Sequence, residues 1–125
     1  MIENIRLGKK EEALLYKLRR SYGISNWNIL CRAAFCNSMS RPDEPVEYEL
    51  KSDSSIEMTW KTFGGPRSEI YYALLVERYK DSSNSSVMNS ESYYHHFRLH
   101  LTRGLTALLD YGSLRDWFIE ACIQE

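Results

Sequence analysis

Cysteine and proline are scarce in this sequence of 125 residues, which contains three of each. The cysteines Cys31, Cys36 and Cys122 are odd in number and include no Cys-x-x-Cys pair. This pattern predicts reduced thiols rather than a disulfide framework, as is typical of a cytoplasmic protein. Cys31 and Cys36 fall on a predicted helix among apolar neighbours, so we expect both thiols to be packed in the interior.

Long apolar runs are also missing. No stretch approaches the roughly 18 apolar residues of a membrane helix, and no segment resembles a secretory signal peptide. We therefore expect neither export nor a membrane span, and a cytoplasmic location. The chain is 43% hydrophobic and 13% aromatic, which is typical of a folded protein. Its length predicts one domain, residues 1–125, that buries roughly two thirds of its unfolded surface.

Charge is nearly balanced overall, at −1, but it is distributed unevenly along the chain. Residues 1–41 carry eight lysines and arginines against three glutamates, whereas residues 42–57 carry six acidic residues against Lys51. A basic segment beside an acidic one indicates one surface that faces a polyanion and another that does not. Charge alone leaves open the simpler interpretation that these are ordinary solvated side chains.

Hydrophobic periodicity predicts a mainly α fold that begins with a strand-helix-helix unit. An alternating segment at 2–7 precedes helices at 9–22 and 26–39, which a Gly-Ile-Ser break separates. Gly23 suits the left-handed conformation that ends a helix, and Ser25 or Asn26 can cap the next one.

The second half of the chain predicts a bundle of about three helices with at most one more short strand. Its expected elements are a strand at 56–61, helices at 66–80 and 92–111, a mobile loop at 81–92, and a last helix that carries Leu114, Trp117, Phe118 and Ala121. The single domain would then comprise a basic head at 1–41, an acidic loop and short strand at 42–65, and a helical part at 66–125.

The N-terminal unit matches the outline of a ribbon-helix-helix module, in which two chains pair one short strand each and insert the ribbon into the major groove. Strand alternation would place Ile5 and Leu7 in the core and turn Asn4 and Arg6 towards base edges. Amides at the start of the second helix, 25–28, could hold a phosphate. Basic side chains would give affinity without sequence information. The candidate DNA-binding residues are Arg6, Lys9, Lys10, Lys17, Arg19 and Arg20.

Two other interpretations of the same unit stay open. A helix-turn-helix would also bring two helices to DNA, but it requires a small residue four positions before the turn glycine. That position holds Arg19, which counts against this motif. An ordinary helical hairpin with solubilising charges is the remaining possibility.

Few residues point to catalysis or to a bound metal. His96 and His100, four apart on a helix, form half of a possible metal site, with His95 beside them. No glutamate stands between them as in His-Glu-x-x-His, and no cysteine or carboxylate pair completes the set. The Gly64-Gly65 turn lacks the Gly-Lys ending of a P-loop. We therefore expect no metal, no cofactor, no catalytic residue and no enzymatic activity.

Gly104 lies inside the longest predicted helix, where glycine costs about 1 kcal/mol relative to alanine. The usual compensation is the close approach of another helix. Aromatic residues, including nine tyrosines, are abundant enough to suggest subunit contacts as well as core packing.

Three blocks of the sequence stand out. Residues 28–36 read Asn-Ile-Leu-Cys-Arg-Ala-Ala-Phe-Cys, the Gly64-Gly65 turn leads into 70–75, and residues 97–105 begin with Phe-Arg-Leu-His-Leu-Thr-Arg-Gly. These blocks resemble, in order, the N-x-L-C-R-x-A segment, the central turn and helix, and the F-R-x-H-L-x-R-G helix of the DndE family of DNA sulfur modification (DNA phosphorothioation) proteins. The resemblance covers most of the chain, and the loops 40–57 and 81–92 fall outside it.

The resemblance implies a bacterial protein that acts with other Dnd proteins, namely a cysteine desulfurase, a sulfur-transferring reductase-like protein and an ATPase. It also implies a homotetramer that binds DNA, preferentially nicked duplex, through a lysine-rich surface to which Lys9, Lys10 and Lys17 would belong. The sequence thus predicts a DNA-binding accessory subunit of a phosphorothioation complex. The alternatives are a protein-protein adaptor without DNA contact and a metal-dependent nickase that uses the histidines.

Overall fold

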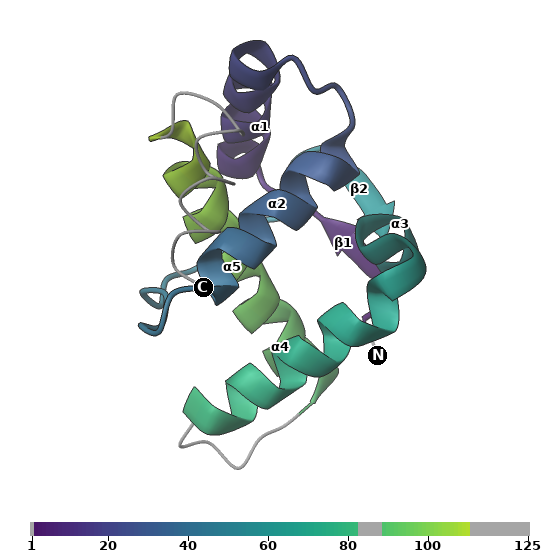
Figure 1. The fold of residues 1–125 in the computed structure, drawn as a ribbon, viewed down its shortest axis with the longest axis vertical. Coiled ribbons are helices and arrows are strands. Elements are labelled where there is room, and N and C mark those ends of the chain that lie inside the picture. The colour runs from purple at the N-terminus through teal and green to yellow at the C-terminus, as the bar shows by residue number, and fades with distance from the viewer. Residues whose placement is uncertain (1, 83–88, 111–125) are drawn as a thin grey trace.

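The computed structural model describes residues 2–82 and 89–110, and it confirms the mainly α prediction (Figure 1). Residues 83–88 of the predicted loop and the predicted helix after 111 lie outside the described residues. No helix in the described ranges combines the length and apolarity that a membrane crossing requires. The elements are β1 (Asn4–Arg6), α1 (Lys9–Tyr22), α2 (Trp27–Met39), β2 (Glu57–Thr59), α3 (Trp60–Gly64), the 3-10 turn η1 (Gly65–Arg67), α4 (Ser68–Ser82) and α5 (Ser90–Leu109).

The strand-helix-helix unit forms as predicted, but its strand pairs within the chain. β1 lies antiparallel to β2, with Ile5 opposite Met58. Both backbone polar groups of Arg6 are bonded to the Tyr94 hydroxyl, which accepts from its N–H at 2.9 Å and donates to its C=O at 3.0 Å. A ribbon-helix-helix module would pair this strand with the same strand of a second chain. In the structure it pairs with β2 of its own chain instead.

Alternation along β1 is as the sequence predicts. Ile5 and Leu7 are buried, whereas Asn4 and Arg6 are exposed. The expected strand at 56–61 is shorter than predicted because Thr59 caps a helix: its hydroxyl accepts a hydrogen bond from the Thr62 amide at 3.0 Å. That cap starts α3, a short helix that periodicity did not reveal.

The core forms around α5, which packs against α1, α2 and α4. Phe97 on this helix contacts the rings of Phe35, Trp60 and Phe63. On α4, Leu75 faces inward, whereas Ile70 and Leu74 are 56% and 50% exposed. In Figure 1, α1 and α4 lie towards opposite ends of the long axis.

Gly104 explains how closely α5 approaches α2. A Cβ at this position would lie 1.8 Å from the carbonyl oxygen of Ala34. The close helix approach expected from the sequence is thus confirmed, and it occurs within the chain, between α5 and α2.

Gly104→Ala is expected to destabilise the fold, although alanine is the better helix former. The clash is with the backbone of α2, so relief requires the helices to separate, and overpacking of this kind costs about 1–3 kcal/mol. Urea unfolding would measure the change, with Thr106→Ala on the exposed face of the same helix as the control. An unchanged or higher unfolding midpoint for Gly104→Ala would contradict the proposed contact.

Candidate nucleic-acid interface

The exposed face of α1 is basic. Leu15 and Leu18 are fully buried, so the opposite side of the helix faces solvent. Lys9, Lys17 and Arg20 lie on that outer side, at i, i+8 and i+11, and all three are exposed. Lys10 flanks them and is exposed as well. The helix ends as predicted at Gly23, whose φ of 70° is in the left-handed region.

Both glutamates of α1 are bonded within the chain. Glu11 is buried and accepts two hydrogen bonds from Arg98 of α5, at 2.7 Å from Nε and 2.9 Å from Nη2. Glu12 accepts a hydrogen bond of 2.6 Å from the Ser54 hydroxyl. Within the described ranges, no salt bridge neutralises the four outward cations of α1, which are Lys9, Lys10, Lys17 and Arg20.

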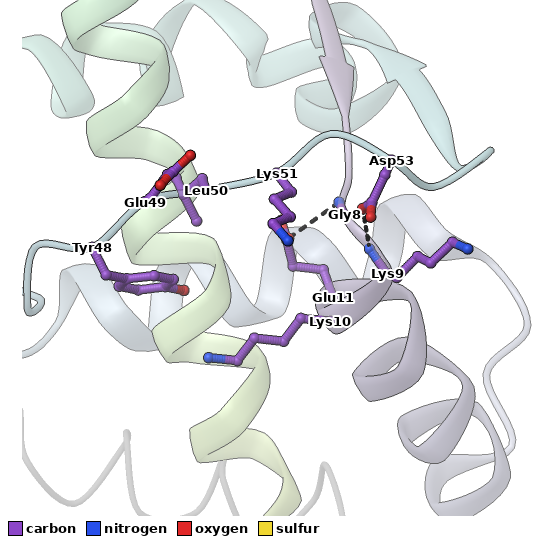
Figure 2. Close-up of a pocket in the computed structure, with 9 residues that line it drawn as sticks. All are labelled: Gly8, Lys9, Lys10, Glu11, Tyr48, Glu49, Leu50, Lys51 and Asp53. Atoms are coloured by element: carbon purple, nitrogen blue, oxygen red, sulfur yellow. Dashed lines mark hydrogen bonds between the residues drawn. The ribbon is translucent and has the colours of Figure 1, made fainter.

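Lys9 and Lys10 also border a pocket of about 390 Å³ at the start of α1 (Figure 2). The Lys9 amide donates to Asp53 at 2.9 Å, and this bond is the largest cause of the lowered pKa of that carboxyl. Figure 2 shows Lys10 extending towards Tyr48, and its ammonium lies 4.9 Å from the centre of that ring. Lys9 extends away from the ring. This end of the basic face is therefore anchored to the segment at 48–53.

Two of the six predicted DNA-binding residues lie apart from this face. The Arg6 side chain donates from Nε to the Ser54 carbonyl at 3.1 Å. The Arg19 guanidinium lies over Trp27, at 4.6 Å from the ring centre, and over Tyr16, at 4.9 Å. Both cations are thus bonded or stacked within the fold. The structure brings together Lys9, Lys10, Lys17 and Arg20, and it separates Arg6 and Arg19 from them.

Two acidic residues of the segment 42–57, Asp43 and Glu44, pair with arginines that the sequence did not assign to them. Asp43 pairs with Arg41 at 3.1 Å and with Arg103 at 3.2 Å. Glu44 pairs with Arg78 at 2.7 Å. Arg98 and Arg103 on α5 also bond within the fold, Arg98 to Glu11 and Arg103 to Asp43 and the Ser38 carbonyl.

Of the two cysteines among the described residues, Cys31 is buried, as expected, whereas Cys36 is only half-buried. Burial, with a smaller contribution from Glu11, raises the pKa of Cys31 to about 12. Burial also raises the pKa of Cys36, although Tyr71 and Arg32 partly oppose it. Thiols held in the protonated form are poor nucleophiles, so the geometry favours packing over sulfur chemistry at both positions.

The three histidines have different surroundings. His95 is half-buried and bonded to Glu47, whereas His96 and His100 are buried. Burial lowers the pKa of His96, and it lowers that of His100 to about 3 with smaller contributions from His96 and Arg103. The sequence alone does not identify a third ligand for this pair, because Glu44 lies far from it along the chain, in a segment without regular structure. The structure places Glu44 beside it.

Comparison with known proteins gives one family match and several similar solved structures. Residues 4–116 match the sequence model of a protein family that is described as DNA sulphur modification protein DndE. The fold resembles DndE from Escherichia coli B7A, involved in DNA phosphorothioation modification, with a TM-score of 0.72 and 22% identity over 86% of this chain and 98% of that one. It also resembles a glycine-to-lysine mutant of DndE involved in DNA phosphorothioation. That comparison has a TM-score of 0.70 and 20% identity, over 89% of this chain and 100% of that one. No match was found among curated proteins.

Replacing Arg98 by methionine is expected to destabilise the protein strongly. The change leaves the buried Glu11 carboxylate without its partner cation. Removing one partner of a buried ion pair lowers the free energy of unfolding by about 3–5 kcal/mol. A double-mutant cycle with Glu11→Gln, followed by urea unfolding, measures the coupling between the two groups. The double variant should lose clearly less than the sum of the single variants. Additive losses would show that the pair does not act as a unit.

Proposed function

This chain belongs to the DndE family of DNA sulphur modification proteins, and from that membership we propose that it is a DNA-binding accessory subunit of a phosphorothioation complex. The outer face of α1 would hold the duplex. Partner Dnd proteins, among them a sulfur-transferring reductase-like protein and an ATPase, would carry out the chemistry. We assign no catalytic residue and no cofactor to the chain itself.

The observation that carries this proposal is the set of four exposed cations on one helix face. Lys9, Lys17 and Arg20 recur along α1, with Lys10 at their edge, and the helix's own carboxylates, Glu11 and Glu12, are bonded within the fold. Exposed cations in a row attract phosphates regardless of base sequence, and binding releases counterions from the DNA. A single helix face makes few phosphate contacts, so several copies would be needed for tight binding, in agreement with the proposed tetramer.

A preference for nicked duplex fits the same mechanism. A break makes DNA easier to bend, so cations of neighbouring copies could reach phosphates on both sides of it at lower deformation cost. The proposal requires only that the basic faces of the copies share one surface.

An adaptor without DNA contact is the second candidate, and one observation favours it. Ile70 and Leu74 are exposed one turn apart on α4, towards the opposite end of the molecule from α1. Exposed apolar groups of this kind are typical of protein contacts. A protein partner docked on α4 would leave α1 free to bind DNA, because the basic and apolar surfaces are separate.

Reversing the charge at Lys9, Lys10 and Lys17 is expected to weaken DNA binding. If each lysine neutralises about one phosphate, the plot of the logarithm of the association constant against the logarithm of salt concentration should become less steep, by about three in slope. Fluorescence anisotropy with intact and nicked duplexes of the same sequence, over a series of salt concentrations, would measure both affinity and slope.

The matched control is the triple variant Lys61→Glu, Arg67→Glu and Lys80→Glu. It makes the same change in net charge at exposed positions outside α1. Equal losses in the two triple variants would indicate attraction by net charge alone and would exclude α1 as the binding face. Absence of DNA binding by the unmodified protein, combined with binding to a Dnd partner, would favour the adaptor.

A further inference from the structure

Three side chains that the proposed DNA interface does not use converge beneath the segment that follows α2. They are Glu44, His96 and His100, and one donor atom of each lies within 4.8 Å of the other two. Glu44 Oε1 is 3.9 Å from His96 Nε2. The two imidazole rings meet edge to face, with centres 4.6 Å apart.

Both imidazoles leave a nitrogen unused. Among the described residues, Nε2 of His96 and Nε2 of His100 are buried and have no hydrogen-bond partner. His96 is 7% exposed and His100 is fully buried, so water does not readily satisfy these atoms. An unsatisfied buried polar atom is costly, and two in neighbouring side chains call for a shared explanation.

Neighbouring groups orient two of the three side chains, those of His100 and Glu44. His100 Nδ1 lies 2.7 Å from the Ser38 hydroxyl, so its Nε2 is the nitrogen left free. Arg78 donates to Glu44 Oε2 at 2.7 Å, which leaves Oε1 turned towards His96. Hydrogen bonds to the far side of each ligand are a common property of protein metal sites, where they fix the tautomer and the orientation of the ligand.

We propose that Glu44, His96 and His100 bind a divalent transition-metal ion of the zinc class. Two imidazole nitrogens and one carboxylate oxygen form a ligand set that suits zinc, with a fourth position left for water. Metal–ligand bonds of about 2.0–2.2 Å require ligand atoms roughly 3.3–3.6 Å apart. The contraction from the present separations is within reach of Glu44, which lies in a loop with its side chain 36% exposed.

The surroundings select against hard cations. Calcium takes at least about six oxygen ligands and magnesium binds mainly to oxygen, whereas this cluster offers two nitrogens and one carboxylate. The guanidinium groups of Arg78 and Arg103 lie close by and oppose any cation, so only strong nitrogen coordination can offset them.

The bound ion would join the acidic segment 42–57 to α5. The segment already contacts α4 and α5 through Arg78 and Arg103, and a coordination bond to Glu44 would fix it further. Because the ion would bind the folded chain and not the unfolded one, metal binding should raise thermal stability. The role is structural and does not depend on the DNA-binding proposal.

Calorimetric titration of the untagged protein with zinc chloride tests the site. We expect one ion per chain, together with a higher unfolding temperature. Cobalt(II) should give the visible bands of a tetrahedral site without the thiolate charge-transfer band of cysteine ligands. His96→Gln and Glu44→Gln should each lower zinc affinity by at least about tenfold and abolish the thermal shift.

His95→Gln is the matched control, because it makes the same substitution on the neighbouring histidine, which is bonded to Glu47 instead. It should bind zinc like the unmodified protein. Circular dichroism checks folding, and the partly exposed Glu44 provides a test even if His96→Gln fails to fold. Lack of zinc binding by the unmodified protein, equal affinities for His95→Gln and His96→Gln, or unchanged affinity in Glu44→Gln would overturn the proposal.

Discussion

The ion pair between Glu11 and Arg98 is the constraint on which the arrangement of the N-terminal half depends. Burying two charges is costly unless all their hydrogen-bonding groups are used. Here Arg98 also donates to the Lys51 carbonyl at 2.7 Å and to the Ser52 hydroxyl at 3.0 Å, while Glu11 accepts from the Gly8 amide at 3.2 Å. Helix α1, helix α5 and the segment between the strands are thus joined at one point, which sets the rotation of α1 and therefore which side chains face solvent.

Positive charge has two separate roles in this protein. Arg78 and Arg103 donate to carbonyls at and after the end of α2, among them Met39 at 3.1 Å and Ser38 at 2.8 Å, where a helix has unpaired carbonyl groups. Arg32 performs the same task for Phe63 at the end of α3, at 2.8 Å. Arginine suits these positions because its planar group donates several bonds at once. The lysines and Arg20 of α1 have no such partners among the described residues, and this leaves them available for a ligand.

Whether the sequence predicts a feature of this structure depends on how far apart along the chain the interacting residues are. The bounds of α1 and the αL glycine after it could be predicted because they depend on neighbours a few residues away. The burial of Ile5 and Leu7 follows from alternation alone. By contrast, Glu11 and Arg98 are 87 positions apart, and the first-turn position of Glu11 suggested only a favourable helix dipole. Glu44 belongs to an irregular segment without periodicity, so its place beside His96 could come only from the folded chain. For the same reason, the sequence suggested a common role for Arg6 and Lys9, which the tertiary contacts of Arg6 separate.

The hydroxyl of Tyr94 has a consequence beyond the position of one strand. By occupying both backbone groups of Arg6, it closes part of an edge that could otherwise add further strands from any extended polypeptide. A single phenol thereby limits, at this edge, the indiscriminate growth that open strand edges permit.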